Sequence, residues 1–224
     1  MKSIFIILGY GIPKDIFTDE NYNIYLKSVF NKIYDQVITN KIEKPLIICS
    51  GGPTDIVSPF RRTEAGEMVK FLKKLSKKKY LKDITKDWEF VADIQALSTL
   101  ENFLNCKEII KNKKINKANI YIFGEHTRNK RLKILASKIF DKNFNTQIIT
   151  IDFDTSLNRY LDPKFIQKKE TEAQKIDLKC LKSGEELQKN HEVLIDKIKF
   201  LRKFPPEKQA DAIKKYWDKR LKGK

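Results

Sequence analysis

The stretch Ser3-Ile-Phe-Ile-Ile-Leu8, followed directly by Gly9-Tyr-Gly11, decides the fold class of this chain. It is a short apolar run without alternation, which is typical of a strand buried on both faces of a parallel sheet. A second run of this kind, Pro45-Leu-Ile-Ile-Cys-Ser50, is ended by Gly51-Gly52-Pro53. Two such strands separated by a segment of helical period predict an α/β protein.

The rest of the chain continues this alternation and then changes to helices alone. Further strands are expected at 88–92, 119–123 and 146–152, with helices at 24–38, 63–75, 99–111, 130–140, 185–202 and 206–221. The pattern predicts a Rossmann-like three-layer sandwich around a parallel sheet. We expect this domain to cover residues 1–160, followed by a basic helical C-terminal extension over 161–224. The helices of the extension could pack back on the sheet or mediate association, and the sequence leaves both open.

The charge of the chain is strongly positive and is spread along the chain, with mild enrichment in the C-terminal tail. The 224 residues include 46 basic and 29 acidic side chains, for a net charge of +17, and only seven of the basic residues are Arg. Proteins that read phosphates and bases favour Arg, whose planar guanidinium binds in a bidentate manner. We therefore keep nucleic-acid binding only as a less favoured alternative.

Cysteine usage and hydropathy indicate a protein of the cytoplasm. Cys49, Cys106 and Cys180 are odd in number and have no CxxC spacing, so they predict neither a disulfide framework nor a zinc site. The apolar start at residues 4–8 is too short for a signal peptide, and no segment has the length of a membrane span. We expect a cytoplasmic protein without a membrane span.

Glycines and a serine follow the first two strands, at the edge where ligands collect in parallel sheets. Gly9 and Gly11 let the backbone approach a ligand, although a tight turn explains them equally well. Ser50, Gly51 and Gly52 add a hydroxyl and further backbone amides after the second strand. Two glycines without a third do not make a dinucleotide fingerprint, so each loop alone is a weak signal.

The start of the next helix adds charged groups to the same edge. Thr63 is expected to cap this helix and to belong to the ligand-binding residues. Glu64 would stand in the first turn, where an acid also suits the helix dipole. Arg61 and Arg62 precede the cap, where they could hold a phosphate or a carboxylate. The structural alternative is that both arginines face water.

The third strand is followed by the segment Leu97-Ser-Thr-Leu-Glu-Asn102. Ser98 or Thr99 would cap the helix, with Glu101 and Asn102 in the first turn as candidate ligand-binding groups. With Ser98 as the cap, Glu101 takes the position that completes a capping box, which is a purely structural explanation.

The fourth strand is followed by Gly124-Glu-His-Thr-Arg-Asn-Lys-Arg131. His126 stands at the strand end, which suits proton transfer or orientation of a ligand. The other histidine, His191, lies in the polar tail and is expected at the surface. Four consecutive strand ends that all carry polar or glycine-rich elements predict one shared pocket.

In order and spacing these motifs resemble the family of unknown function that includes YdcF, SanA and ElyC. The resemblance covers roughly residues 3–152 and implies a Rossmann-like fold with a polar pocket. It implies these site residues: Gly9, Gly11, Ser50, Gly51, Gly52, Glu64, Ser98, Thr99, Glu101, Asn102 and Arg131. Many members carry His-x-x-Arg after the fourth strand, whereas Asn129 stands at that offset here, so Arg128 or Arg131 must supply the cation. The chain shows no membrane anchor like that of the envelope-linked members, and we therefore do not transfer an envelope role.

The leading functional hypothesis is an enzyme, a hydrolase or transferase, that acts on a small anionic or nucleotide-type molecule. Glycine amides and Arg131 would hold a phosphate or carboxylate, while Glu64 and Glu101 would serve as general base or bind a ribose. Phosphate-ester hydrolysis is the first chemistry to test, and S-adenosylmethionine or a nucleotide is an admissible cofactor. Two carboxylates and an Asn are compatible with Mg²⁺, but without a DxD-type cluster we predict no metal site. The alternative is a module that senses the same ligand without catalysis.

Overall fold

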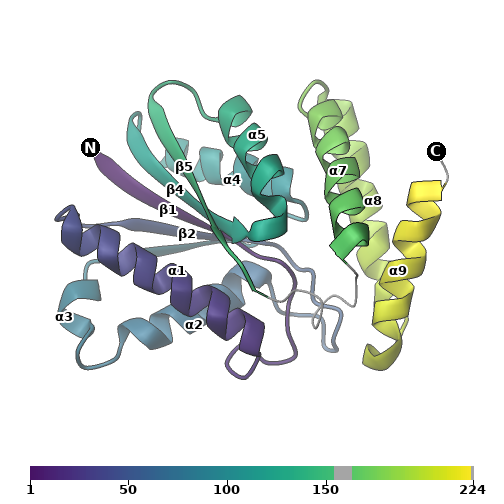
Figure 1. Cartoon of the computed structure of the whole chain (residues 1–224), viewed down its shortest axis with the longest axis horizontal. Helices are drawn as coiled ribbons and strands as arrows, with labels where there is room; N and C mark the ends of the chain where they lie inside the picture. The colour runs from purple at the N-terminus through teal and green to yellow at the C-terminus, as the bar shows by residue number, and fades with distance from the viewer. Residues whose placement is uncertain (154–162, 223–224) are drawn as a thin grey trace.

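The computed structural model describes residues 1–153 and 163–222 and contains a five-stranded, fully parallel sheet at its centre (Figure 1). The order of the strands is β3-β2-β1-β4-β5. Their bounds are β1 Lys2–Leu8, β2 Leu46–Ser50, β3 Glu89–Asp93, β4 Ala118–Glu125 and β5 Phe144–Ile151. The expected Rossmann-like α/β fold is therefore confirmed.

Helices cover both faces of the sheet, which makes three layers. Side chains of α1 (Glu20–Thr39) and α2 (Glu64–Ser76) form one hydrophobic core with the sheet. Side chains of α4 (Thr99–Asn112) and α5 (Asn129–Ile139) form a second core on the opposite face. The short helix α3 (Lys82–Thr85), which precedes β3, was not expected from the sequence.

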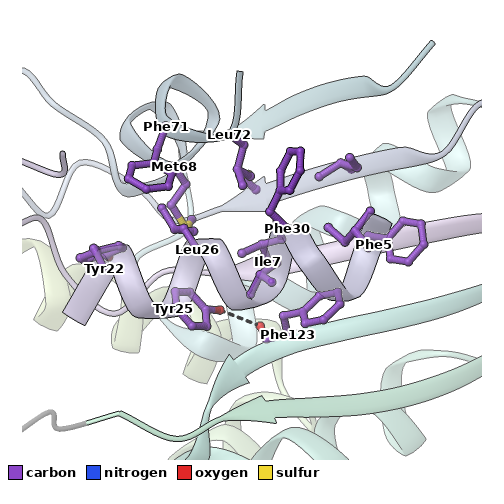
Figure 2. Packing of buried hydrophobic residues seen from close by; sticks show 14 of the residues in the cluster. Phe5, Ile7, Tyr22, Tyr25, Leu26, Phe30, Met68, Phe71, Leu72 and Phe123 are labelled. Carbon is purple, nitrogen blue, oxygen red and sulfur yellow. Dashed lines mark hydrogen bonds between the residues drawn. The ribbon is translucent and has the colours of Figure 1, made fainter. Parts of the chain in front are cut away.

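The first strand explains why its sequence does not alternate. Phe5 and Ile7 contribute to the core under α1 and α2, while Ile4 and Ile6 contribute to the core under α4 and α5, and all four are buried. Both faces of a central parallel strand exclude water, so apolar residues are required at every position. Figure 2 shows Phe5 and Ile7 packed beside α1, together with the hydroxyl of Tyr25 pointing at the backbone of β4.

Three helices follow the sheet: α7 (Pro163–Cys180), α8 (Gly184–Leu201) and α9 (Pro206–Lys222). They stand side by side beyond the carboxyl ends of the strands (Figure 1), and α7 contacts α5 and the short 3-10 helix η1 (His126–Arg128). The extension therefore packs back on the Rossmann-like part of its own chain. The boundary expected at residue 160 lies outside the described residues. Within the described ranges, no helix combines the length and apolarity needed to cross a bilayer.

Candidate functional site

The centre of the sheet edge has the geometry that creates ligand sites in open parallel sheets. The chain leaves β1 toward the face covered by α1 and leaves β4 toward the face covered by α5. Connections that part in this way open a crevice between the two strand ends. The hydroxyl of Tyr25 marks this point, because it lies 2.9 Å from the carbonyl oxygen of Leu8 and 3.2 Å from that of Phe123.

A cavity of about 320 Å³ lies at this crevice, with the sheet edge on one side and α7, α8 and α9 on the other. The predicted residues that line it are Gly9, Gly11, Gly51, Glu64, Ser98, Thr99, Asn102 and Arg131. The predicted residues outside its lining are Ser50, Gly52, Thr63, Glu101 and His126. The structure therefore brings together at least one residue from each of the four strand-end motifs, but not all of the candidates.

Three of the four glycine amides that follow β1 and β2 are bonded within the chain and are not available to a ligand, contrary to our expectation. Gly9 donates its amide to the carbonyl of Ser50 at 3.0 Å, and Gly51 donates to Asp93 at 3.0 Å. Gly52 donates to Ala96 at 2.7 Å. Neighbouring strands of a parallel sheet continue their pairing into these loops, so the amides are already used within the chain.

The glycines instead make room for the carboxylate of Glu64. A Cβ atom on Gly9 would lie 2.0 Å from Glu64 Oε2, and one on Gly51 would lie 2.6 Å from the Glu64 Cβ. Glu64 is buried at 8% exposure, lines the cavity, and accepts a hydrogen bond from the hydroxyl of Thr54 at 2.5 Å. Thr63 caps α2, as predicted, by accepting from the amide of Gly66 at 3.1 Å.

Ser50 belongs to a buried polar network behind the cavity. Its hydroxyl lies 2.6 Å from Asp93 Oδ2 and 3.0 Å from Asn102 Oδ1. Asp93 also accepts from the side-chain amide of Asn105 at 3.1 Å. Through Asn102, this network holds a cavity-lining side chain in place. Sequence reasoning missed Asp93, although an acid that ends a strand at the ligand edge could have identified it.

The capping interpretation of Ser98 is confirmed, and it explains Glu101. Ser98 Oγ accepts from the amide of Glu101 at 3.1 Å. The return bond differs by one residue from the expected capping box, because Glu101 accepts from the amide of Leu97 at 2.7 Å rather than from that of Ser98. The second carboxylate oxygen of Glu101 lies 3.2 Å from Nδ1 of His191 on α8. His191, which we expected at the surface, is half-buried and forms a contact between α8 and α4.

His126 lies at the start of η1, where its side chain is exposed and its Nδ1 is 3.4 Å from the hydroxyl of Thr150. The side chain of His126 therefore lies beside Thr150 of the edge strand β5, and it does not line the cavity.

Arg128 is a buried cation that lines the cavity and has a donor without an acceptor among the described residues. It is buried at 9% exposure, lines the cavity, and donates from Nη1 to the carbonyl oxygen of Gly9 at 2.9 Å. Within the described part of the chain, its Nε is buried without an acceptor. A buried donor without a partner is costly, so this guanidinium is suited to a further acceptor.

Arg131, the alternative cation, is fully engaged by α7. Its Nε and Nη2 donate to the two carboxylate oxygens of Asp177 at 2.6 and 3.2 Å, and its Nη1 donates to Glu170 at 3.0 Å. All three nitrogens therefore have partners inside the protein. The sequence could not predict this, because the partners come from a helix about forty residues further along the chain.

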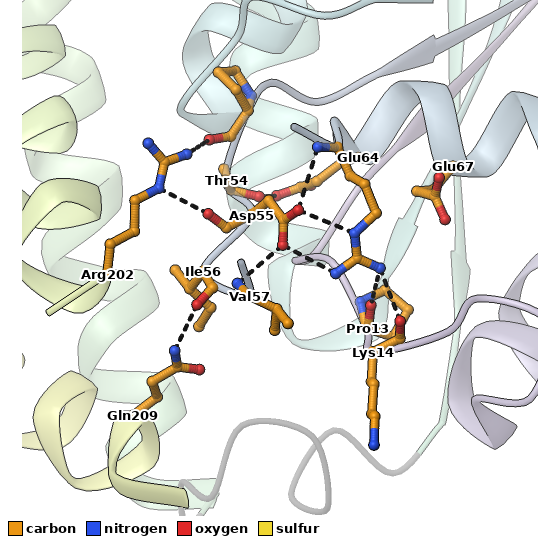
Figure 3. Close-up of polar contacts among 12 residues, drawn as sticks. Pro13, Lys14, Thr54, Asp55, Ile56, Val57, Glu64, Glu67, Arg202 and Gln209 are labelled. Carbon is orange, nitrogen blue, oxygen red and sulfur yellow. Dashed lines mark hydrogen bonds and ion pairs between the residues drawn. The ribbon is translucent and has the colours of Figure 1, made fainter. Parts of the chain in front are cut away.

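The loop between β2 and α2 joins the two sides of the cavity (Figure 3). Arg62 binds the carboxylate of Asp55 through Nε and Nη2, each at 3.0 Å, and its Nη1 donates to the carbonyl oxygens of Pro13 and Lys14. Arg62 therefore does not hold a ligand, whereas Arg61 is exposed. From α8 and the start of α9, Arg202 donates to the carbonyl of Asp55 at 2.9 Å, and Gln209 donates to that of Ile56 at 2.7 Å.

The described residues contain no group of three or more His, Cys, Asp or Glu side chains that could hold a metal ion.

Comparison of the chain with family models, with curated proteins and with solved structures gave no match. The function of the chain is therefore inferred from the geometry of the cavity.

Proposed function

We propose that the chain binds a small anionic or nucleotide-type molecule in the cavity at the β1–β4 crevice, as a YdcF-like protein with hydrolase or transferase activity. The observation that carries this proposal is Arg128, a buried cation at the cavity whose guanidinium uses one of its five donors on a backbone carbonyl. A bound carboxylate or phosphate would accept from the remaining donors. Such charge-assisted hydrogen bonds are about twice as strong as neutral ones.

The size and lining of the cavity suit a ligand with an apolar or aromatic part. Tyr10, Ile12 and Leu97 line it on the sheet side, and Leu194 and Trp217 line it on the side of the C-terminal helices. Small-molecule sites combine an apolar lining with a few polar groups that fix orientation. A nucleotide or S-adenosylmethionine meets this description, as does a smaller phosphate ester.

Glu64 would serve as the general base of the reaction. It contacts Gly9, whose carbonyl oxygen accepts from Arg128, so the carboxylate and the guanidinium flank the same residue. With a phosphate ester held by Arg128, Glu64 would accept a proton from a water or hydroxyl as that oxygen attacks phosphorus. The P–O bond to the ester group would break in the same step, and the departing oxygen would take a proton from solvent. Arg128 would stabilise the charge that develops on the phosphoryl oxygens.

A panel of nucleotides, sugar phosphates and adenosyl compounds, screened by thermal shift, tests the proposal. We expect stabilisation by at least one compound, and we expect Arg128→Met to weaken its binding about 10- to 100-fold through lost charged hydrogen bonds. Arg61→Met is the matched control, because it removes an exposed arginine outside the cavity lining. Absence of binding across the panel, or equal binding by the two variants, would refute the proposal.

The second candidate is a non-catalytic module that senses the same ligand. It is favoured by one observation: of the three candidate catalytic residues, Glu64 lines the cavity, whereas Glu101 and His126 do not. Glu64→Gln distinguishes the two functions when turnover of the bound compound is followed by product formation. Loss of turnover with retained binding supports the enzyme. Retained binding without product in the unmodified protein supports the sensor.

A further inference from the structure

The three C-terminal helices each contribute one residue to a cationic cluster on the wall of the cavity. Lys169 comes from α7, Lys197 from α8 and Trp217 from α9, and all three line the cavity. These helices stand side by side beyond the strand ends (Figure 1), and α7 contacts η1, the short helix that ends at Arg128. The cluster and Arg128 therefore belong to neighbouring elements around one cavity.

The indole ring of Trp217 holds the two ammonium groups near each other. Nζ of Lys169 lies 5.6 Å from the ring centroid, and Nζ of Lys197 lies 5.5 Å from it. Cations within about 6 Å of an indole face are attracted to the ring. Trp217 is 7% exposed and the side chain of Lys169 is 15% exposed, so little water screens the repulsion between the two like charges. An anion bound beside both lysines would relieve this repulsion.

The carboxylates of the lining do not cancel its cations. The described cations that line the cavity are Arg128, Arg131, Lys169 and Lys197, and the described carboxylates are Glu64, Glu170 and Asp177. Asp177 gives both of its oxygens to Arg131. Glu170 divides its oxygens between Arg131, at 3.0 Å, and Lys169, at 3.7 Å. The lining thus keeps one positive charge in excess, and the net charge of +17 on the whole chain adds to the attraction for an anion.

We propose that Lys169 and Lys197 form a second anion-binding position in the cavity, so that the ligand carries at least two linked anionic groups, as di- and triphosphates do. This inference rests on the proposed function, in which Arg128 holds the first anionic group. An ammonium group has three donors on a flexible stem, so each lysine can stay beside Trp217 while it donates to a phosphate oxygen. A cavity of about 320 Å³ is large enough for a small ligand that contacts both positions.

The test measures how affinity changes with the number of linked phosphates. The probes are inorganic phosphate, pyrophosphate and tripolyphosphate, titrated by calorimetry at constant ionic strength because salt screens charge effects. The full chain is compared with the double variant Lys169→Met with Lys197→Met, which keeps the length of both side chains and removes their charges. The matched control is Lys168→Met with Lys199→Met, which removes two charges from the same helices at exposed positions outside the cavity lining.

We expect the unmodified protein and the control to bind tripolyphosphate at least about tenfold more tightly than phosphate. Lys169→Met with Lys197→Met should lower the affinity for tripolyphosphate about 10- to 100-fold, and that for phosphate less than about threefold, because Arg128 remains. Lys169→Arg with Lys197→Arg should restore the preference. Lys197→Met alone leaves Lys169 beside Glu170 and should lower the affinity for tripolyphosphate about tenfold, so it replaces the double variant if that protein does not fold.

Two outcomes would overturn this inference and leave the proposed function standing, provided that Arg128→Met still weakens phosphate binding. One is an equal loss of tripolyphosphate affinity in the double variant and its matched control, which would assign the effect to overall charge. The other is an unchanged affinity for tripolyphosphate when both cavity lysines are replaced by Met. Failure of the unmodified protein to bind any of these probes or any compound of the earlier panel would overturn both proposals.

Discussion

Gly9 is the residue at which the two charged groups of the cavity meet. Its carbonyl oxygen accepts from Arg128, and its Cα hydrogens face the carboxylate of Glu64. We expect Gly9→Ala to destabilise the fold by about 1–3 kcal/mol, because the added methyl group overlaps the Glu64 side chain. Urea denaturation measures the loss, and the variant should also lose ligand binding as Glu64 is displaced.

Gly184→Ala serves as the control for this substitution. No atom lies within 4 Å of a Cβ added at Gly184, which begins α8. This change should leave stability unaltered or raise it by up to about 1 kcal/mol, in line with helix propensity. Equal destabilisation by both substitutions would show that the contact between Gly9 and Glu64 is not tight.

The roles of individual residues could be predicted from the sequence where they depend on neighbouring residues in the chain. Thr63 and Ser98 cap their helices as the sequence indicates, because a cap depends on the residues that immediately follow it. The choice between Arg128 and Arg131 could not be made in this way. It depends on which guanidinium meets the carboxylates of α7, and a tertiary contact of this kind leaves no local pattern.

At the scale of elements, the buried strands were the most predictable. Both faces of β1 and β2 are covered, so each strand is an uninterrupted apolar run. The edge strand β5 begins at Phe144, two residues before the predicted start at 146. The prediction missed this start because exposed polar residues, Asn145 and Gln147, interrupt the apolar pattern of the strand. Helix α3 spans four residues, too few to show a helical period.

The attachment of α7 should weaken in acid, through Glu170. The pKa of Glu170 is about 2 in the folded protein, against an ordinary value of 4.5, so ionised Glu170 favours the folded state above pH 4.5. This contribution, on the order of 3 kcal/mol, should disappear as the pH falls through the folded-state pKa. In urea titrations, the difference in unfolding free energy between the unmodified protein and Glu170→Gln should therefore shrink between about pH 5 and pH 2. A difference that does not vary with pH would contradict the assigned pKa.

At the scale of the whole molecule, docking of the C-terminal helices completes the cavity. The sequence did not choose between docking and association, because the amphipathic pattern of a helix does not identify the surface that it covers. The docked arrangement combines apolar contacts, such as Cys180 of α7 in the core beneath α4 and α5, with polar contacts, such as Arg202 and Gln209 donating to backbone carbonyls of the loop between β2 and α2. Any polar surface side chain could play that part.

Removing these contacts should loosen the extension while the sheet stays folded. In the double variant Arg202→Ala with Gln209→Ala, we expect the local opening free energy of α9 and of residues 53–62 to fall by about 1–3 kcal/mol. Amide hydrogen exchange measures this as faster exchange in both segments, with β1 and β4 unchanged. The double variant Lys203→Ala with Lys208→Ala, at neighbouring exposed positions, should exchange like the unmodified protein. Uniform acceleration across the chain would instead indicate that the extension and the sheet unfold as one unit.

The loop of residues 53–62 couples the C-terminal helices to Glu64, because hydrogen bonds hold the loop on two sides. Arg62 ties it to the segment after β1, Arg202 and Gln209 tie it to the C-terminal helices, and Thr54 within it donates to Glu64. A shift of α8 and α9 would therefore pull on Thr54 and rotate the carboxylate of Glu64. Events at the far end of the chain could in this way tune the reactivity of an acid at the sheet edge without touching the ligand.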